Sequence, residues 1–103
     1  MYKLEFLPIV KKDIDDIIFY ISNILKNPFA AIKLSKSFIN GAKSIFEFPY
    51  GMSEYNTVIK LKNVYRCFKI KNFFTFYITD EKEKKVVIVR VLYQKMDIKN
   101  VLE

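Results

Sequence analysis

The sequence predicts a single α+β domain in which an antiparallel-rich sheet packs against an N-terminal helical hairpin. Apolar residues recur at helical spacing through the first half of the chain, whereas strand-like runs separated by short polar turns fill the second half. The expected element order is β-α-α-β-β-β. Because the chain has 103 residues and 51% of them are hydrophobic, it suffices for one core, and we expect one domain over residues 1–103.

The first half reads as one strand followed by two helices. Residues 2–7 have the pattern of a strand, and Pro8 then opens a helix at a position where its missing N–H is harmless. Asn27 is a typical N-cap and Pro28 a typical first helical residue, so a second helix starts there. Its apolar positions are Ala31, Leu34, Phe38, Ala42, Ile45 and Phe46, and it ends before residues 48–51.

The second half reads as strands with a short helix after them. Residues 57–61 form a candidate short strand, and residues 65–70 and 73–79 predict a hairpin around Lys71-Asn72. Residues 85–93 are rich in β-branched side chains on both faces, which indicates a central strand. Residues 96–102 predict a final helical turn or two. An extra strand and a terminal helix are thus compatible with the expected order.

The chain has no histidine and a single cysteine, Cys67. These counts exclude Ser-His-Asp and Cys-His catalysis, His-ligated zinc and an internal disulfide. We expect Cys67 to be a small core residue, and we expect no cofactor and no metal site. Because no apolar run approaches the roughly 20 residues that span a bilayer and no cleavable leader pattern is present, we expect a cytoplasmic protein without a membrane partner.

The net charge of +7 is concentrated in the second half of the chain. Residues 57–103 contain nine Lys, two Arg and five acidic residues, whereas residues 1–56 contain seven Lys and six acidic residues. A basic half suggests an anionic partner, which could be nucleic acid, a ribosome or an acidic protein segment. A general lysine-rich bias of composition is the alternative. Lys60, Lys62, Lys69 and Lys71 are read as a solvated strand face that could also attract such a partner.

Several short runs occur in an order that resembles the RelE/ParE superfamily, the small toxins of bacterial type II toxin–antitoxin modules. The likeness covers nearly the whole chain and depends on the ordered set, since each piece alone is common. The runs are Phe19-Tyr20-Ile21, Asn27-Pro28, Ala30-Ala31, Phe48-Pro49-Tyr50-Gly51, Tyr65-Arg66, Phe76-Tyr77 and Val89-Arg90-Val91-Leu92.

The resemblance implies a toxin that inhibits bacterial growth and supports plasmid stabilization. It also implies a cognate antitoxin, and binding to operator DNA only through that antitoxin. The long helical hairpin joined at Asn27-Pro28 looks more like the ParE branch, whose members inhibit DNA gyrase. The alternative is a RelE-like, ribosome-dependent mRNA interferase, which would be a metal-independent endoribonuclease. A member that binds only its antitoxin is a third possibility.

Four residues are candidates for contacts to an anion or a partner: Arg66, Arg90, Tyr93 and Lys95. Either arginine could contact an anion on an accessible sheet face away from the helices, or instead pair with a helix carboxylate such as Asp16. Tyr93 and Lys95 follow at the end of the last strand. In the interferase reading the two arginines clamp the phosphate, with Tyr93 or Lys95 near the leaving group.

Overall fold

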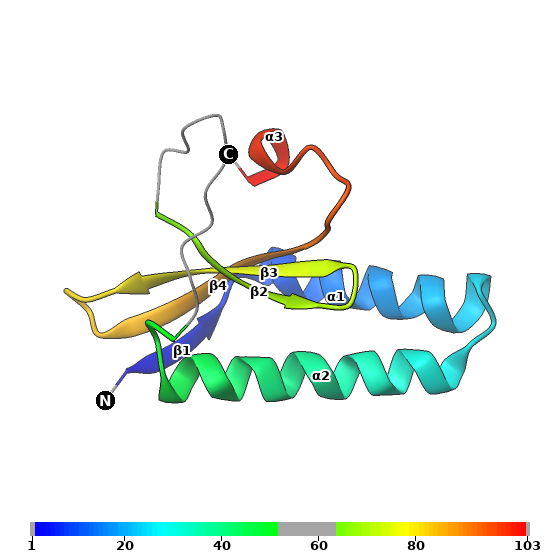
Figure 1. The fold of residues 1–103 in the computed structure, drawn as a ribbon, viewed down its shortest axis with the longest axis horizontal. Helices are drawn as coiled ribbons and strands as arrows, with labels where there is room; N and C mark the ends of the chain where they lie inside the picture. Colours follow the sequence, from blue (N-terminus) through cyan, green and yellow to red (C-terminus); the bar gives the residue numbers. More distant parts are fainter. Residues whose placement is uncertain (1, 52–63, 103) are drawn as a thin grey trace.

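The computed structural model describes residues 2–51 and 64–102, which form one layer of sheet with helices on both faces (Figure 1). The predicted short strand over residues 57–61 lies outside the described residues. The elements in chain order are β1 (Lys3–Phe6), α1 (Pro8–Phe19), a π-helical turn η1 (Tyr20–Ile24), α2 (Pro28–Glu47), β2 (Arg66–Ile70), β3 (Phe73–Asp80), β4 (Lys85–Tyr93) and α3 (Ile98–Leu102).

The sheet has the strand order β1-β4-β3-β2. The β2–β3 and β3–β4 pairs are antiparallel hairpins, which confirms the prediction of an antiparallel-rich sheet with an interior β4. The N-terminal strand β1 pairs with β4 in parallel, a pairing that the sequence pattern did not indicate. β1 and β2 therefore form the two edges of the described sheet.

The ends of the two long helices follow from local sequence. Leu7 is extended, as the residue before a proline favours, and α1 begins at Pro8. At the start of α2, the Asn27 side chain accepts a hydrogen bond from the backbone N–H of Ala30 at 3.2 Å, so the predicted N-cap is confirmed. Between α1 and α2, the backbone N–H of Leu25 donates to the carbonyl oxygen of Tyr20. This hydrogen bond spans five residues, which is the spacing of a π-helical turn.

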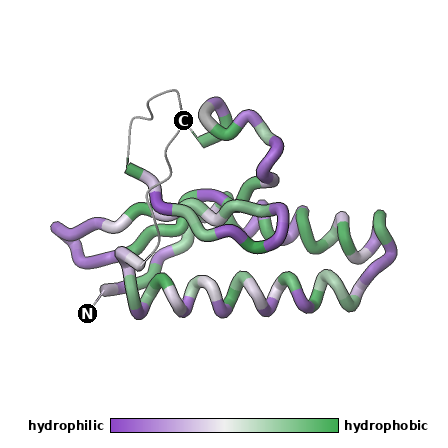
Figure 2. Tube along the Cα trace, in the orientation of Figure 1, coloured by the Kyte–Doolittle hydropathy of each residue, from purple (hydrophilic) through white to green (hydrophobic). Residues whose placement is uncertain are grey.

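The helical hairpin of α1, η1 and α2 covers one face of the sheet and forms the larger core. In Figure 1, α2 runs along the sheet and extends past the β2–β3 turn, whereas the β3–β4 turn extends beyond the other end of the helix. In Figure 2 the strands are mostly green, whereas the β3–β4 turn is purple. Five of the six apolar positions predicted for α2 are buried; Phe46 is only partly buried. The buried residues of this core are Val10, Leu34, Phe38, Ala42, Ile45, Phe68, Tyr77, Val86, Ile88 and Val91.

A second, smaller core lies on the opposite face of the sheet, beneath α3. Ile98 of α3 packs there with Phe76, Val89 and Leu92 of the strands and with Tyr65. The helix predicted at the C-terminal end is therefore confirmed, and it closes part of the face that we expected to be open. None of the helices in the described part of the chain is long and apolar enough to cross a bilayer.

Candidate functional site

Arg90 is held by Asp13 of α1 in a bidentate ion pair. Its Nε and Nη2 atoms donate to the two carboxylate oxygens of Asp13 at 2.8 and 2.9 Å. The Arg90 and Asp13 side chains are only 20% and 11% exposed. The hydrogen bonds with Asp13 raise the pKa of Arg90, while partial burial acts against them. This fork-to-fork geometry is the strong form of an ion pair, and it commits Arg90 to the fold.

The place of Asp13 follows from the end of β1. The last paired residue of β1 is Phe6, opposite Ile88, so within residues 2–51 and 64–102 the next part of the β4 edge has no neighbouring strand. There the Asp13 carboxylate accepts the backbone N–H of Val91 at 3.0 Å. Asp13 thus replaces a strand partner and neutralises Arg90 at the same time.

The expected structural partner, Asp16, is not the residue that holds either arginine. Asp16 bonds to Lys12, one turn earlier on the exposed side of α1, at 2.9 Å. A signal for Asp13 existed in the sequence: it lies three residues after Val10 and four before Ile17, on the buried stripe of α1. Helical phase, rather than acidic composition, would have identified it.

Arg66 lies on the same sheet face as Phe68 and Ile70, which belong to the core under the helices. Its guanidinium carbon is 4.9 Å from the ring centre of Tyr50, a cation–π distance. Strand β3 separates it from Arg90 in the sheet. The expectation that both guanidinium groups share an accessible face away from the helices is therefore wrong, because each is directed to a partner on the helical side.

Tyr50 also belongs to a polar cluster at the β3–β4 turn. The phenol groups of Tyr2 and Tyr50 both donate to Glu81 Oε1, Tyr50 at 2.6 Å, and Lys84 bonds the other oxygen at 2.8 Å. Hydrogen bonds from Lys84, then from the two phenols, lower the pKa of Glu81 to about 2. The bond to Glu81 raises the pKa of Tyr50 to about 12. This cluster joins the start of the chain, the end of α2 and a turn of the sheet.

Tyr93 and Lys95 lie at the opposite end of the sheet from this cluster. Tyr93 is paired with Phe73, and their ring centres are 5.9 Å apart. Arg66 is paired with Tyr77, four residues further along β3, which places it about 13 Å away along the strand direction. Lys95 is exposed in the turn after β4. The structure therefore does not assemble the four candidate residues into one site.

The turn between β2 and β3 is tied to the end of β4. The backbone N–H of Gln94 donates to the carbonyl oxygen of Asn72 at 2.9 Å. The side-chain Nε2 of Gln94 also donates to Oδ1 of Asn72, at 3.3 Å. Lys71 adopts a positive φ of 52° to close this turn. The exposed lysines Lys71 and Lys95 are consequently carried by two connected turns at one end of the sheet.

A hollow lies at this end of the sheet, beneath the closed end of the helical hairpin; we call it the distal hollow. Its volume is about 730 Å³. Tyr93, Lys71 and Phe73 form its sheet side, whereas Tyr20 of the π-turn and Asp16 form part of its helical side. Sequence analysis did not single out Tyr20, and it assigned Lys71 to a solvated strand face that could also attract an anionic partner. Lys60 and Lys62 lie outside the described residues.

A second hollow, of about 360 Å³, adjoins the strand end and brings Arg90 and Tyr93 together. Lys12, Asp13 and Met96 also line it. Two of the four candidate residues therefore share a surface, but the Arg90 guanidinium there already has its carboxylate. Around Tyr93, the exposed lysines Lys71 and Lys95 lie on the adjoining turns, and Asp16 lines both hollows.

The described groups with shifted pKa values do not resemble acid–base catalysts. Burial raises the pKa of the Cys67 thiol to about 12, which suits its predicted place in the core. Paired carboxylates raise the pKa of Lys12, Lys84 and Lys85, the direction opposite to the one that a lysine base requires. Among residues 2–51 and 64–102 there is no group of three side chains placed to hold a metal ion.

Comparison with known proteins gives two positive findings. The family model for the ParE toxin of the type II toxin–antitoxin system parDE matches residues 4–98. A solved structure of the chromosomal ParDE toxin–antitoxin system from P. aeruginosa is similar with a TM-score of 0.71 at 16% sequence identity, over 90% of this chain and 96% of that one. At this identity the structural likeness concerns the fold. A search of curated proteins found no match.

Proposed function

Because this chain belongs to the family of ParE toxins and is the toxin component of a type II toxin–antitoxin module, we propose that it inhibits growth by binding DNA gyrase. We favour a binder over a nuclease mainly because the guanidinium of Arg90 is already bound to the carboxylate of Asp13. A gyrase target also implies that the toxin acts in the cytoplasm.

The described residues hold no assembled catalytic set, and this supports the same choice. Cleavage of RNA needs a base for the ribose hydroxyl, cations for the developing phosphorane charge and an acid for the leaving oxygen. The sequence has no histidine, Arg90 is bound to Asp13, and Arg66 lies far from Tyr93. A protein that acts by binding needs none of these groups in one place.

We assign the contact with gyrase to the distal hollow and its rim. The exposed ring of Tyr93 provides a large contact area at the hollow, and Lys71 and Lys95 on the adjoining turns provide positive charge. Aromatic residues framed by charges are the usual anchors of protein interfaces. The expected counterpart on gyrase is an apolar side chain flanked by carboxylates.

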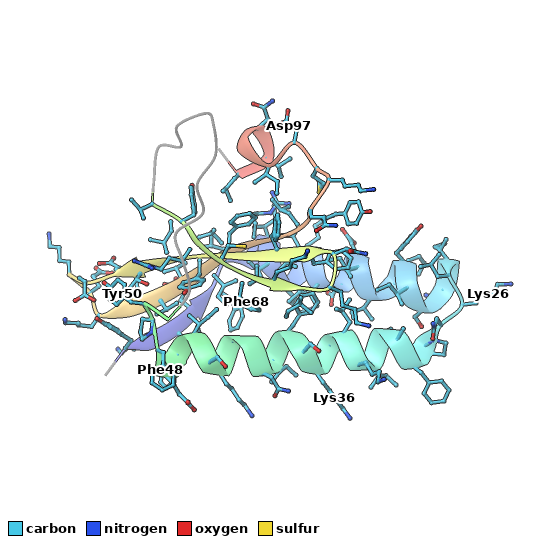
Figure 3. The ribbon with its side chains drawn as sticks, viewed as in Figure 1. Lys26, Lys36, Phe48, Tyr50, Phe68 and Asp97 are labelled. Carbon is cyan, nitrogen blue, oxygen red and sulfur yellow. The ribbon has the colours of Figure 1, made fainter. Side chains whose placement is uncertain are left out.

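A supercoiling assay with purified gyrase and relaxed plasmid tests this proposal. The wild-type chain is expected to inhibit supercoiling, and Tyr93→Ala and Lys95→Glu are each expected to weaken inhibition at least tenfold. Lys36→Glu is the matched control because Lys36 points away from the sheet on the outer side of α2 (Figure 3). Unimpaired supercoiling together with cleavage of ribosome-bound message would overturn the proposal in favour of the interferase.

The cognate antitoxin is the second partner, and we assign its main contact to the closed end of the helical hairpin. Large apolar side chains are exposed there on both sides of the turn, with Phe29 at 80% exposure. Large exposed apolar side chains gathered at one end of a molecule are typical of a protein interaction site. The residues are Phe19, Tyr20, Ile24, Leu25, Phe29 and Ile32. An antitoxin bound there would also cover the neighbouring distal hollow and thereby neutralise the toxin.

Replacing Phe29 tests this assignment. Phe29→Ser is expected to weaken antitoxin binding by a factor of ten or more, measured by calorimetry with the purified antitoxin. Phe48→Ser is the control, because Phe48 is 67% exposed at the other end of α2. Equal losses in the two variants would contradict the placement at the hairpin end.

A further inference from the structure

A cavity of about 200 Å³, partly open to the surface, lies at the edge of the larger core, between the helical hairpin and the sheet. Side chains from α1, α2 and all four strands line it, among them Val10, Phe68 and Ile88. Figure 3 shows Phe68 directed from the sheet toward α2.

One polar group faces this otherwise apolar cavity. Thr75 lines the cavity and is paired in the sheet with Phe68 and Val91, two residues of the helix-facing core, so its side chain points to the same side. The residue is 2% exposed. Within the described part of the chain, its hydroxyl oxygen has no hydrogen-bond partner. A buried hydroxyl without a partner is costly, which makes a ligand that supplies one favourable.

We infer that this cavity binds a small, mainly apolar molecule that carries a single hydrogen-bonding group, of the size and polarity of phenol. Apolar cavities of about 150 Å³ in proteins remain dry and admit benzene, so the volume here suffices for a six-membered ring with one substituent. The hydroxyl of Thr75 can both accept and donate, and it would pair with the polar group of the ligand.

The cavity has a route to the surface. Phe6 of β1 and Ile39 of α2 both line it and are 49% and 55% exposed. Exposed side chains change rotamer rapidly, so entry does not require the helical hairpin to separate from the sheet. The site involves neither Tyr93 nor Lys95, and a failure of this inference therefore leaves the proposed gyrase contact untouched.

A pair of ligands that differ by one hydroxyl tests the inference. Phenol and benzene are titrated separately into the methyl-labelled full-length chain, and the methyl signals of Val10, Ile14, Ile88 and Val91 are followed by NMR. Both ligands are expected to shift these signals. In Thr75→Val, which keeps the shape of the side chain, the preference for phenol over benzene is expected to fall at least fivefold.

Two further variants locate the effect. Ala42→Leu adds volume inside the cavity and should abolish binding of both ligands, whereas Lys36→Ala on the outer side of α2 should change nothing. If the core methyl signals of the wild-type chain stay unmoved at millimolar phenol and benzene, the cavity is not a binding site. If Thr75→Val leaves the phenol preference intact, recognition by the hydroxyl is wrong.

Discussion

Arg90 and Asp13 lie 77 residues apart in the chain and form the ion pair that fixes α1 against β4. The carboxylate has three donors: two guanidinium nitrogens and the backbone N–H of Val91. Such a pair contributes little when compared with a well-packed apolar replacement, but breaking one partner leaves a partly buried charge without compensation. The neighbouring Lys12–Asp16 pair is solvent-exposed and has no comparable role.

Asp13→Asn is expected to lower the free energy of unfolding by about 1–3 kcal/mol, since the amide keeps one acceptor but loses the charge. Asp16→Asn is expected to cost less than about 1 kcal/mol, as exposed pairs do. Urea denaturation of the wild type and both variants measures the difference. Similar losses in the two variants would show that Arg90 does not depend on Asp13.

Glu81 makes stability depend on acid pH. Its pKa in the folded chain is lowered from 4.5 to about 2, mainly by the bond from Lys84 and then by those from Tyr2 and Tyr50. A carboxyl group with a lowered folded pKa stabilises the fold above its unfolded pKa, and this contribution disappears as the carboxylate is protonated. The loss therefore occurs as pH falls from about 4.5 to about 2.

Glu81→Gln should accordingly abolish this part of the acid dependence. The difference in unfolding free energy between the wild type and the variant is expected to be largest near pH 6 and to shrink steadily below pH 4.5, as seen in urea titrations at a series of pH values. Glu47→Gln at the exposed end of α2 serves as the control. A difference that stays constant down to pH 2 would be incompatible with the lowered pKa.

At the scale of the elements, Gly41 lets α2 lie close against Phe68 of β2. A Cβ atom at this position would lie 2.3 Å from Cε2 and 2.6 Å from Cζ of Phe68. Glycine inside a helix normally costs about 1 kcal/mol relative to alanine. Here the absence of a side chain allows the aromatic ring of β2 to pack directly against the helix.

Gly41→Ala is therefore expected to destabilise the chain by about 1 kcal/mol net, because the overpacking of the ring outweighs the gain in helix propensity. In a Phe68→Leu background, which lacks the two clashing ring atoms, the same substitution should stabilise by about 0.5–1 kcal/mol. Thermal and urea unfolding of the four variants of this cycle measure both signs. A destabilising effect in both backgrounds would assign the role of Gly41 to something other than Phe68.

At the scale of the whole molecule, both faces of a single sheet are buried, but by elements of very different size. The helical hairpin covers one face with more than 30 residues of helix, and the five-residue α3 covers part of the other. The order β1-β4-β3-β2 joins the first strand of the chain to the last one. The fold is therefore completed only when both ends of the chain are in place.

Ile98→Ala tests the contribution of α3 to this closure. Ile98 is 7% exposed and packs into the smaller core, so its truncation is expected to cost about 2 kcal/mol and to increase binding of a hydrophobic dye. Val64→Ala, at a residue that is 63% exposed, should stay within about 0.5 kcal/mol of the wild type. A loss at Ile98 no larger than at Val64 would mean that α3 packs too weakly to stabilise the sheet.

Most of the elements were predictable, because their signals are local. The cap at Asn27, the proline that follows it, the turn at Lys71-Asn72 and the limits of β4 at residues 85–93 all appear where the residue pattern indicated them. The π-turn over Tyr20–Ile24 was missed, since its residues continue the apolar spacing of α1 and carry no distinct signal. Of the four candidate residues, only Tyr93 and Lys95 belong to the proposed contact. Their exposure could be predicted because it depends only on their position at the end of a strand.

The amino-acid sequence by itself determined the order of the main helices and strands, the family and the basic character of the second half, because propensity, capping and periodicity act over a few residues. Only the tertiary structure decided that β1 lies parallel to β4, that Asp13 rather than Asp16 receives an arginine, and that Arg66 is remote from Tyr93. These outcomes depend on pairing between segments that lie tens of residues apart in the chain. Beyond the end of β1, for example, the backbone N–H of Val91 needs an acceptor, and the carboxylate of Asp13 provides it.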